Sequence, residues 1–179
     1  MTTLSQDQII LGIDPGLANT GWGVVEKRAG MCHCLGYGCI TTPQADTVPE
    51  RLKTIRDDVA SIIKHFKPSD LAIETIFFGV NAKTEVVTAE ARGAALIAAA
   101  EAGLTVGEYS PPQIKAAVVG NGAAGKDQVQ FMVRAILSLK EMPQPDHAAD
   151  ALAAAVCHSR VAGHTKLEEQ IEEQMRSTK

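Results

Sequence analysis

The segment QIILGID, residues 8–14, carries aliphatic side chains at most positions and ends in an acid. This pattern indicates a buried strand, because a strand with one water-facing side alternates apolar and polar residues. Pro15 and Gly16 follow at once and indicate a turn. A buried strand requires neighbouring strands and a covering layer. The rest of the chain must supply both, and it must also account for the carboxylate of Asp14 at the strand's end.

The sequence contains suitable neighbours for this strand. Two β-prone runs, GWGVVEKR and MCHCLGYGCI, are separated by Ala29 and Gly30 and predict a three-strand meander. The spacing of apolar residues predicts a helix over 49–66, and an Ala-rich run predicts another over 83–102. Short strands are expected at 71–74 and 105–109, and helices at about 111–119, 126–139 and 146–161. This order predicts an α/β fold with helices flanking one mixed sheet.

A length of 179 residues suits one domain, which we assign to residues 8–162. Residues 163–179 are polar and charged, and we expect a frayed helix or a disordered tail there. No run of apolar residues is long enough for a membrane helix, and the N-terminus lacks the pattern of a signal peptide. We therefore expect a cytoplasmic protein whose four cysteines are reduced thiols.

The net charge of −4 is unusual for a nucleic-acid-binding protein, because such proteins are more often basic. Residues 110–140 differ from the whole chain. They contain Lys115, Lys126, Arg134 and Lys140 against Asp127 alone, a local charge of +3. The overall charge is therefore compatible with one basic face.

Acidic residues close two of the predicted strands. Asp14 ends the strand at 8–14, and Glu74 ends the strand at 71–74. Ligands of an open α/β sheet bind beyond the carboxyl ends of its strands, so the two acids meet if their strands are neighbours. Carboxylates so close repel each other, and a divalent cation removes the repulsion. Hard oxygen ligands suit Mg²⁺ or Mn²⁺.

The start of the last predicted helix adds further candidate ligands. His147 and Asp150 are separated by three positions, and Asp146 and Asp150 by four, so each pair shares a helix face. With Asp14 and Glu74, Asp150 and either Asp146 or His147 could hold two metal ions, as in two-metal phosphoryl transfer. Taken singly, the acids have simpler explanations as an N-cap, a turn residue and a solvent-facing charge. Taken together, they point to metal chemistry.

Four segments resemble the conserved blocks of the RuvC family, the bacterial crossover (Holliday) junction endodeoxyribonucleases. They are GIDPGLANTGWGVV, LAIETIFFGVNAKT, EYSPPQIKAAVVGNGAAGKDQVQFMV and PDHAADALAAAVCH. The resemblance runs in order from about Ile9 to His158. It implies an RNase H-like fold with a mixed five-stranded sheet, in a bacterial cytoplasmic protein.

The resemblance also implies an activity. A homodimer would resolve four-way DNA junctions in homologous recombination and repair, by symmetric metal-dependent nicking of two strands. The products would carry 5′-phosphate and 3′-hydroxyl ends. Two Mg²⁺ ions per active site are the implied cofactor, with Mn²⁺ as the alternative. Junction DNA and a branch-migration helicase complex are the implied partners.

Residue by residue, the resemblance assigns Asp14, Glu74 and Asp150 to the metal-binding acids of the family. His147 stands where most members carry Asp, and Asp146 falls outside the match. Histidine can bind a metal or carry a proton, so His147 joins the catalytic and metal-binding set.

The DNA-contacting residues are also assigned by the resemblance. Lys115 and Lys126 match lysines that contact phosphates, and Phe77 matches an aromatic that reaches the junction centre, where it could stack on a base. Simpler explanations remain open, namely surface lysines and a core phenylalanine. The helix at 83–102 matches part of the family's dimer interface, although a central core helix would show the same pattern.

Two other functions are compatible with parts of the sequence. GIDPGLANTG also resembles the first phosphate motif of actin-like ATPases, although those proteins are usually longer and have two domains. A junction-binding protein without catalysis is the second alternative, against which Asp14, Glu74 and Asp150 argue. The segment GNGAAGKD nearly matches a nucleotide-binding P-loop, but Asp127 stands where Ser or Thr would bind Mg²⁺.

Overall fold

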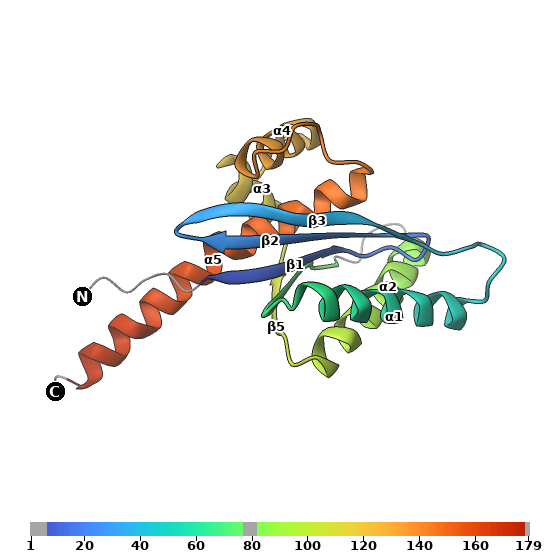
Figure 1. The fold of residues 1–179 in the computed structure, drawn as a ribbon, viewed down its shortest axis with the longest axis horizontal. Helices are drawn as coiled ribbons and strands as arrows, with labels where there is room; N and C mark the ends of the chain where they lie inside the picture. The colour runs from blue at the N-terminus through green and yellow to red at the C-terminus, as the bar shows by residue number, and fades with distance from the viewer. Residues whose placement is uncertain (1–6, 77–81, 178–179) are drawn as a thin grey trace.

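The computed structural model of the protein describes residues 7–76 and 82–177 (Figure 1). In this part of the chain, five strands form one mixed sheet in the order β3-β2-β1-β4-β5. They are β1 (Gln8–Asp14), β2 (Asn19–Arg28), β3 (Met31–Thr41), β4 (Asp70–Glu74) and β5 (Thr105–Tyr109). The pairs β1–β2 and β2–β3 are antiparallel, and the pairs β1–β4 and β4–β5 are parallel. The predicted mixed sheet is confirmed.

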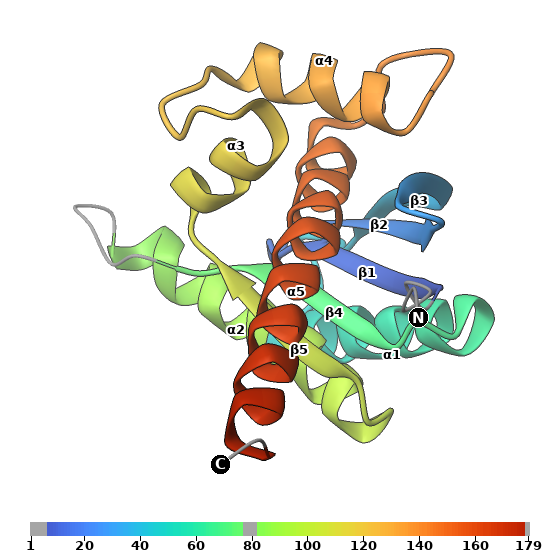
Figure 2. The same cartoon turned by 90° about the vertical axis from the view of Figure 1, so that its left-hand side faces the viewer.

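Helices cover both faces of the sheet (Figures 1 and 2). On one face lie α1 (Val48–Phe66) and α2 (Ala82–Glu101). The other face carries α3 (Pro111–Val119), α4 (Lys126–Ile136) and α5 (Asp146–Ser177), with α5 directly against the strands in Figure 2. This double cover explains the aliphatic run in β1. Ile10 packs in the layer beneath α3, α4 and α5, while Leu11 and Ile13 pack against α1 and α2.

Two glycines allow α5 to lie unusually close to the strands. A Cβ atom on Gly12 would stand 1.9 Å from the carbonyl oxygen of Ala151, and one on Gly21 would stand 1.9 Å from that of His147. Any side chain at these positions would therefore push α5 away from the sheet. The close approach fixes the first turns of α5 beside the end of β1, where Asp14 lies.

Two helices differ in length from the prediction. The backbone of α5 continues to Ser177, beyond the expected end near Val161, because the polar residues that follow are good helix formers. In contrast, α4 ends at Ile136 instead of near residue 139, since Ser138 adopts a left-handed conformation with φ of 52°. The proposed domain boundary at residue 162 stays a prediction.

Among the described residues, no helix is long and apolar enough to span a membrane.

Candidate active site

Asp14 and Glu74 meet at the carboxyl ends of neighbouring parallel strands. In the register of β1 and β4, Ile13 lies opposite Ile73, so the next residues of both strands are the two acids. Both line a cavity of about 280 Å³. The expected meeting of these acids is therefore observed.

Burial and like charge govern the protonation of this pair. Burial raises the pKa of Glu74 to about 7, and the negative charges of Asp14 and Asp150 add to the effect. Burial also raises the pKa of Asp14, against the hydrogen bond that it shares with His147. Carboxylates with raised pKa values that share one cavity are typical of functional sites, because catalysis and metal binding bring acids together in partly buried places.

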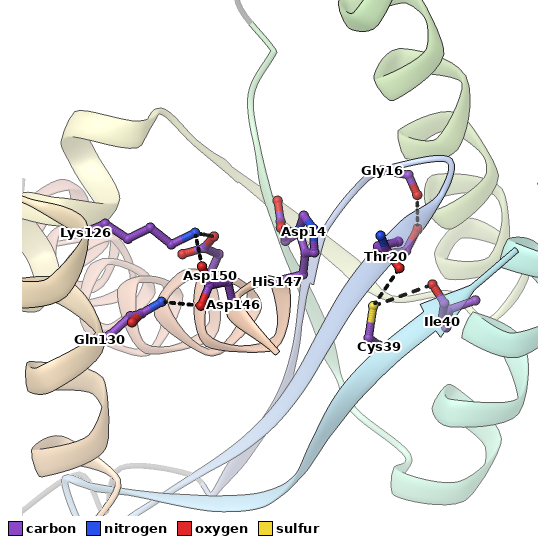
Figure 3. Close-up of polar contacts among 11 residues, drawn as sticks. Asp14, Gly16, Thr20, Cys39, Ile40, Lys126, Gln130, Asp146, His147 and Asp150 are labelled. Atoms are coloured by element: carbon purple, nitrogen blue, oxygen red, sulfur yellow. Dashed lines mark hydrogen bonds and ion pairs between the residues drawn. The ribbon is translucent and has the colours of Figure 1, made fainter. Parts of the chain in front are cut away.

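The first turn of α5 brings His147 to this pair. Its Nδ1 lies 2.7 Å from Oδ2 of Asp14 (Figure 3). The imidazole is 45% exposed and also lines a second, larger cavity. His147 is therefore in contact with Asp14 and also reaches the protein surface.

Lys126, the first residue of α4, lies between two acids of α5. Its Nζ is 3.1 Å from Oδ2 of Asp150 and 3.3 Å from Oδ2 of Asp146 (Figure 3). Asp146 also accepts a hydrogen bond from Nε2 of Gln130 at 3.2 Å. Burial lowers the pKa of Lys126, but Asp150 and Asp146 outweigh it and raise the pKa above its ordinary value. The ammonium therefore stays charged and offsets one of the two negative charges on the α5 side of the site.

The other predicted DNA-contacting residues are Lys115 and Phe77. Lys115 lies on α3, and its positive charge acts to lower the pKa of Glu74 against the larger effect of burial, which places it near the acids. Phe77 lies outside the described residues.

Comparison with known proteins decides the family. Residues 10–158 match the family described as crossover junction endodeoxyribonuclease RuvC. The chain belongs to the RuvC family. A RuvC from Moorella thermoacetica is 47% identical over 163 residues, which make up 91% of this chain and 98% of that relative.

Solved structures agree with this assignment. The structure titled T. thermophilus RuvC in complex with Holliday junction substrate has a TM-score of 0.82 and 40% sequence identity, over 87% of this chain and 94% of that one. A yeast mitochondrial Holliday junction resolvase, at 12% identity, shares the fold with a TM-score of 0.63 over 93% of this chain and 85% of that one. The RNase H-like fold of the RuvC family is confirmed.

The donor atoms at the RuvC site fit a hard divalent cation. Carboxylate oxygens with one imidazole are ligands that Mg²⁺ and Mn²⁺ accept. The hydroxyl oxygen of Thr75 is buried and has no hydrogen-bond partner among the described residues, and Thr75 lines the cavity of Asp14 and Glu74. In the described part of the chain, no three His, Cys, Asp or Glu side chains are arranged to hold one ion. The two-metal assignment therefore stays a prediction.

Sequence reasoning missed two residues that shape this site, Thr75 and Arg92. The backbone N–H of Thr75 donates to the carbonyl of Tyr109 at 2.9 Å, and Nε of Arg92 donates to the carbonyl of Glu74 at 3.3 Å. These bonds fix the end of β4, and therefore the direction of its acid. Asp146, considered from the sequence as an N-cap or a ligand, pairs with Lys126, and its role as a ligand stays a prediction. No sequence signal pointed to Arg92, because it lies on α2, far along the chain from the end of β4 that it contacts.

Proposed function

We propose that Asp14, Glu74, His147 and Asp150 form the centre with which this RuvC-family endonuclease nicks DNA at four-way junctions. The observation that carries the proposal is the convergence of Asp14, Glu74 and His147 at one sheet edge. Family membership favours nuclease activity over the ATPase alternative. The relative from T. thermophilus, with its Holliday junction substrate, supports junction DNA as the substrate.

The four residues would hold two Mg²⁺ ions, with Mn²⁺ as the alternative. Bound there, the ions would supply a water of lowered pKa and stabilise the leaving oxygen. Burial raises the pKa of Glu74 to about 7 in the metal-free protein, so a cation that binds there near neutral pH would displace a proton from Glu74. His147, through Nδ1, holds the Asp14 carboxylate in one orientation.

In this scheme, Lys126 can bind either the carboxylates of α5 or a DNA phosphate. Without DNA, its ammonium binds the carboxylates of Asp146 and Asp150. A DNA phosphate would compete for the same ammonium, and Asp150 would then become available as a ligand. Lys115 would contact a second phosphate, and Phe77 would stack on a base at the junction centre.

A two-fold dimer would give one active site for each of two strands. Exposed apolar side chains on α2 support this helix as the contact, since Val86 is 49% and Ile97 is 55% exposed. Symmetric nicks with 5′-phosphate and 3′-hydroxyl ends would leave products that a ligase can seal. A branch-migration helicase complex is the expected partner in recombination and repair.

The test is cutting of a synthetic four-way junction by the purified protein with Mg²⁺, with Mn²⁺ or with a chelator. We expect paired nicks with either metal and none with the chelator. Asp14→Asn should bind the junction but leave it uncut, while Asp58→Asn, a matched change on the exposed side of α1, should cut normally. Tight binding without cutting by the unmodified protein in both metals would contradict the proposal.

A further inference from the structure

A second cavity, of about 540 Å³, opens beside the one that Asp14 and Glu74 line. Thr88 of α2 lines both cavities. His147 lines the second cavity and contacts Asp14 at 2.7 Å. A DNA strand whose phosphate lies at Asp14 would therefore place a neighbouring nucleotide at or within this second cavity.

The wall formed by the loop after β1 is held in place by a hydrogen-bond network. Thr42, only 3% exposed, donates through Oγ1 to the carbonyl of Leu17 at 2.5 Å and accepts from Nε of Arg51 at 2.8 Å. The backbone N–H of Thr42 donates to the carbonyl of Ala18 at 3.1 Å. The cavity wall and the Arg51 side chain are therefore ordered before any ligand arrives, which lowers the entropy cost of binding.

The chemistry of the lining suits a nucleotide base. No acidic side chain lines this cavity among the described residues. Asn19 and Gln44 contribute amides, which offer a donor and an acceptor side by side and can pair with the edge of a base such as adenine. Leu17 and Val87 contribute apolar surface for the face of a base. A site for phosphate alone would instead be dominated by cations.

The amide of Asn19 also contacts the side chain of Cys39 on the neighbouring strand β3. The thiol of Cys39 donates to Oδ1 of Asn19 at 3.9 Å, a weak contact that uses one of the two lone pairs of this oxygen. Gln44 is exposed at the rim of the cavity, on the loop between β3 and α1. Asn19 therefore lies in the wall of the cavity and Gln44 at its rim, so the two amides approach a bound base from different sides.

We infer that this cavity is a base-reading subsite, in which Asn19 and Gln44 recognise a nucleotide next to the scissile phosphate and set the sequence preference of cutting. The inference rests on the proposed function, because it needs a DNA strand at Asp14. It adds a role for the start of β2 and the loop after β3, which the catalytic set does not use.

The test is a pool of four-way junctions with randomised nucleotides around the crossover, cut with Mg²⁺ and sequenced at the cut ends. We expect the unmodified protein to prefer one nucleotide at a flanking position. Asn19→Ala and Gln44→Ala should each reduce that preference by about tenfold, the loss of one bidentate base contact. Junction binding by both variants should change less than about twofold, because phosphate contacts supply most of the affinity.

Asn121→Ala is the matched control, since it removes an exposed amide outside the cavity, and it should keep the original preference. Equal urea midpoints would exclude unfolding as a cause. An unchanged preference in Asn19→Ala and Gln44→Ala, with cutting slowed equally on every sequence, would overturn the inference while leaving the proposed function intact. Absence of cutting by the unmodified protein would overturn both.

Discussion

Helix α5 carries two histidine–aspartate contacts, one at each end of its buried part, and they differ in what surrounds them. His147 meets Asp14 at 2.7 Å, and its side chain is 45% exposed. His158 meets Asp70 at 3.2 Å, and its side chain is 4% exposed. The same pair of residue types therefore occurs once beside two cavities and once inside the core.

The buried contact forms a closed network. The hydroxyl of Tyr109 lies 2.8 Å from Nδ1 of His158, and Nε2 lies beside Asp70. Burial acts to raise the pKa of Asp70, but the hydrogen bond from Ser69 and the nearby Gln8 and His158 hold it below its usual range. Burial raises the pKa of Tyr109 to about 12, so the phenol keeps its proton and donates to Nδ1. Both ring nitrogens of His158 are then satisfied within the protein.

The two contacts differ in burial and in whether both ring nitrogens of the histidine have hydrogen-bond partners within the protein. The network of His158 ties α5 to β4 and β5, and breaking it would leave buried polar groups without partners. His147 and Asp14 face cavities in which other groups can bind. We conclude that the inner contact contributes mainly to stability and propose that the outer one contributes to activity.

The largest effect on stability is expected from His158→Ala. This change removes a core side chain, leaves the Tyr109 hydroxyl without its partner and takes one hydrogen-bond partner from Asp70, at a cost of about 3 kcal/mol in the free energy of unfolding. Urea unfolding measures it. Tyr109→Phe, which removes only one hydroxyl from the same network, should cost about 1 kcal/mol. A loss below about 1 kcal/mol in His158→Ala would remove the distinction between the two contacts.

A change of pH is expected to have an intermediate effect on the free energy of unfolding, through the titration of Glu74. Its pKa of about 7 lies above the ordinary value of 4.5, so the metal-free folded protein holds a proton that the unfolded chain has already lost in this range. The free energy of unfolding should therefore fall as pH rises from about 4.5 to about 7. Glu74→Gln should flatten that slope, and Glu90→Gln, an exposed change on α2, should keep it. An equal slope in both variants would place the titration elsewhere.

The smallest effect on stability is expected from Lys126→Ala. Its ion pairs are half exposed, so the loss should change the free energy of unfolding by less than about 1 kcal/mol. Junction binding should weaken, and the slope of log affinity against log salt should fall by about 0.9, since one fewer counterion is released. Lys64→Ala, an exposed change on α1, should leave the slope unchanged. The same slope in both variants would show that Lys126 does not contact phosphate.

Much of the fold was predictable, because local patterns determine its elements. The strand at 8–14 and the helix at 111–119 have the predicted bounds, and the family resemblance supplied the topology. The juxtaposition of Asp14 and Glu74 followed from the rule that ligands bind at strand carboxyl ends. The catalytic and metal-binding roles of the predicted residues stay predictions.

The rest depends on contacts that sequence spacing does not reveal. His158 lies 88 positions from Asp70 and 49 from Tyr109, so no local pattern connects them. The pairing of Lys126 with Asp146 depends on where α4 stands relative to α5, and three-dimensional packing decides that. The closeness of α5 to the sheet depends on Gly12 in β1 and Gly21 in β2. A glycine within a strand allows another backbone to approach closely, but the sequence does not say which one.

The most direct measurement compares His147→Ala and His158→Ala in single-turnover cutting of a four-way junction with Mg²⁺, at a temperature where both variants are folded. The account predicts that His147→Ala cuts about 100-fold more slowly or worse, the scale seen when groups that orient or bind a metal are removed. His158→Ala should cut within about threefold of the unmodified protein, since its buried network acts on stability alone. Equal losses in the two variants, or normal cutting by His147→Ala, would contradict the account.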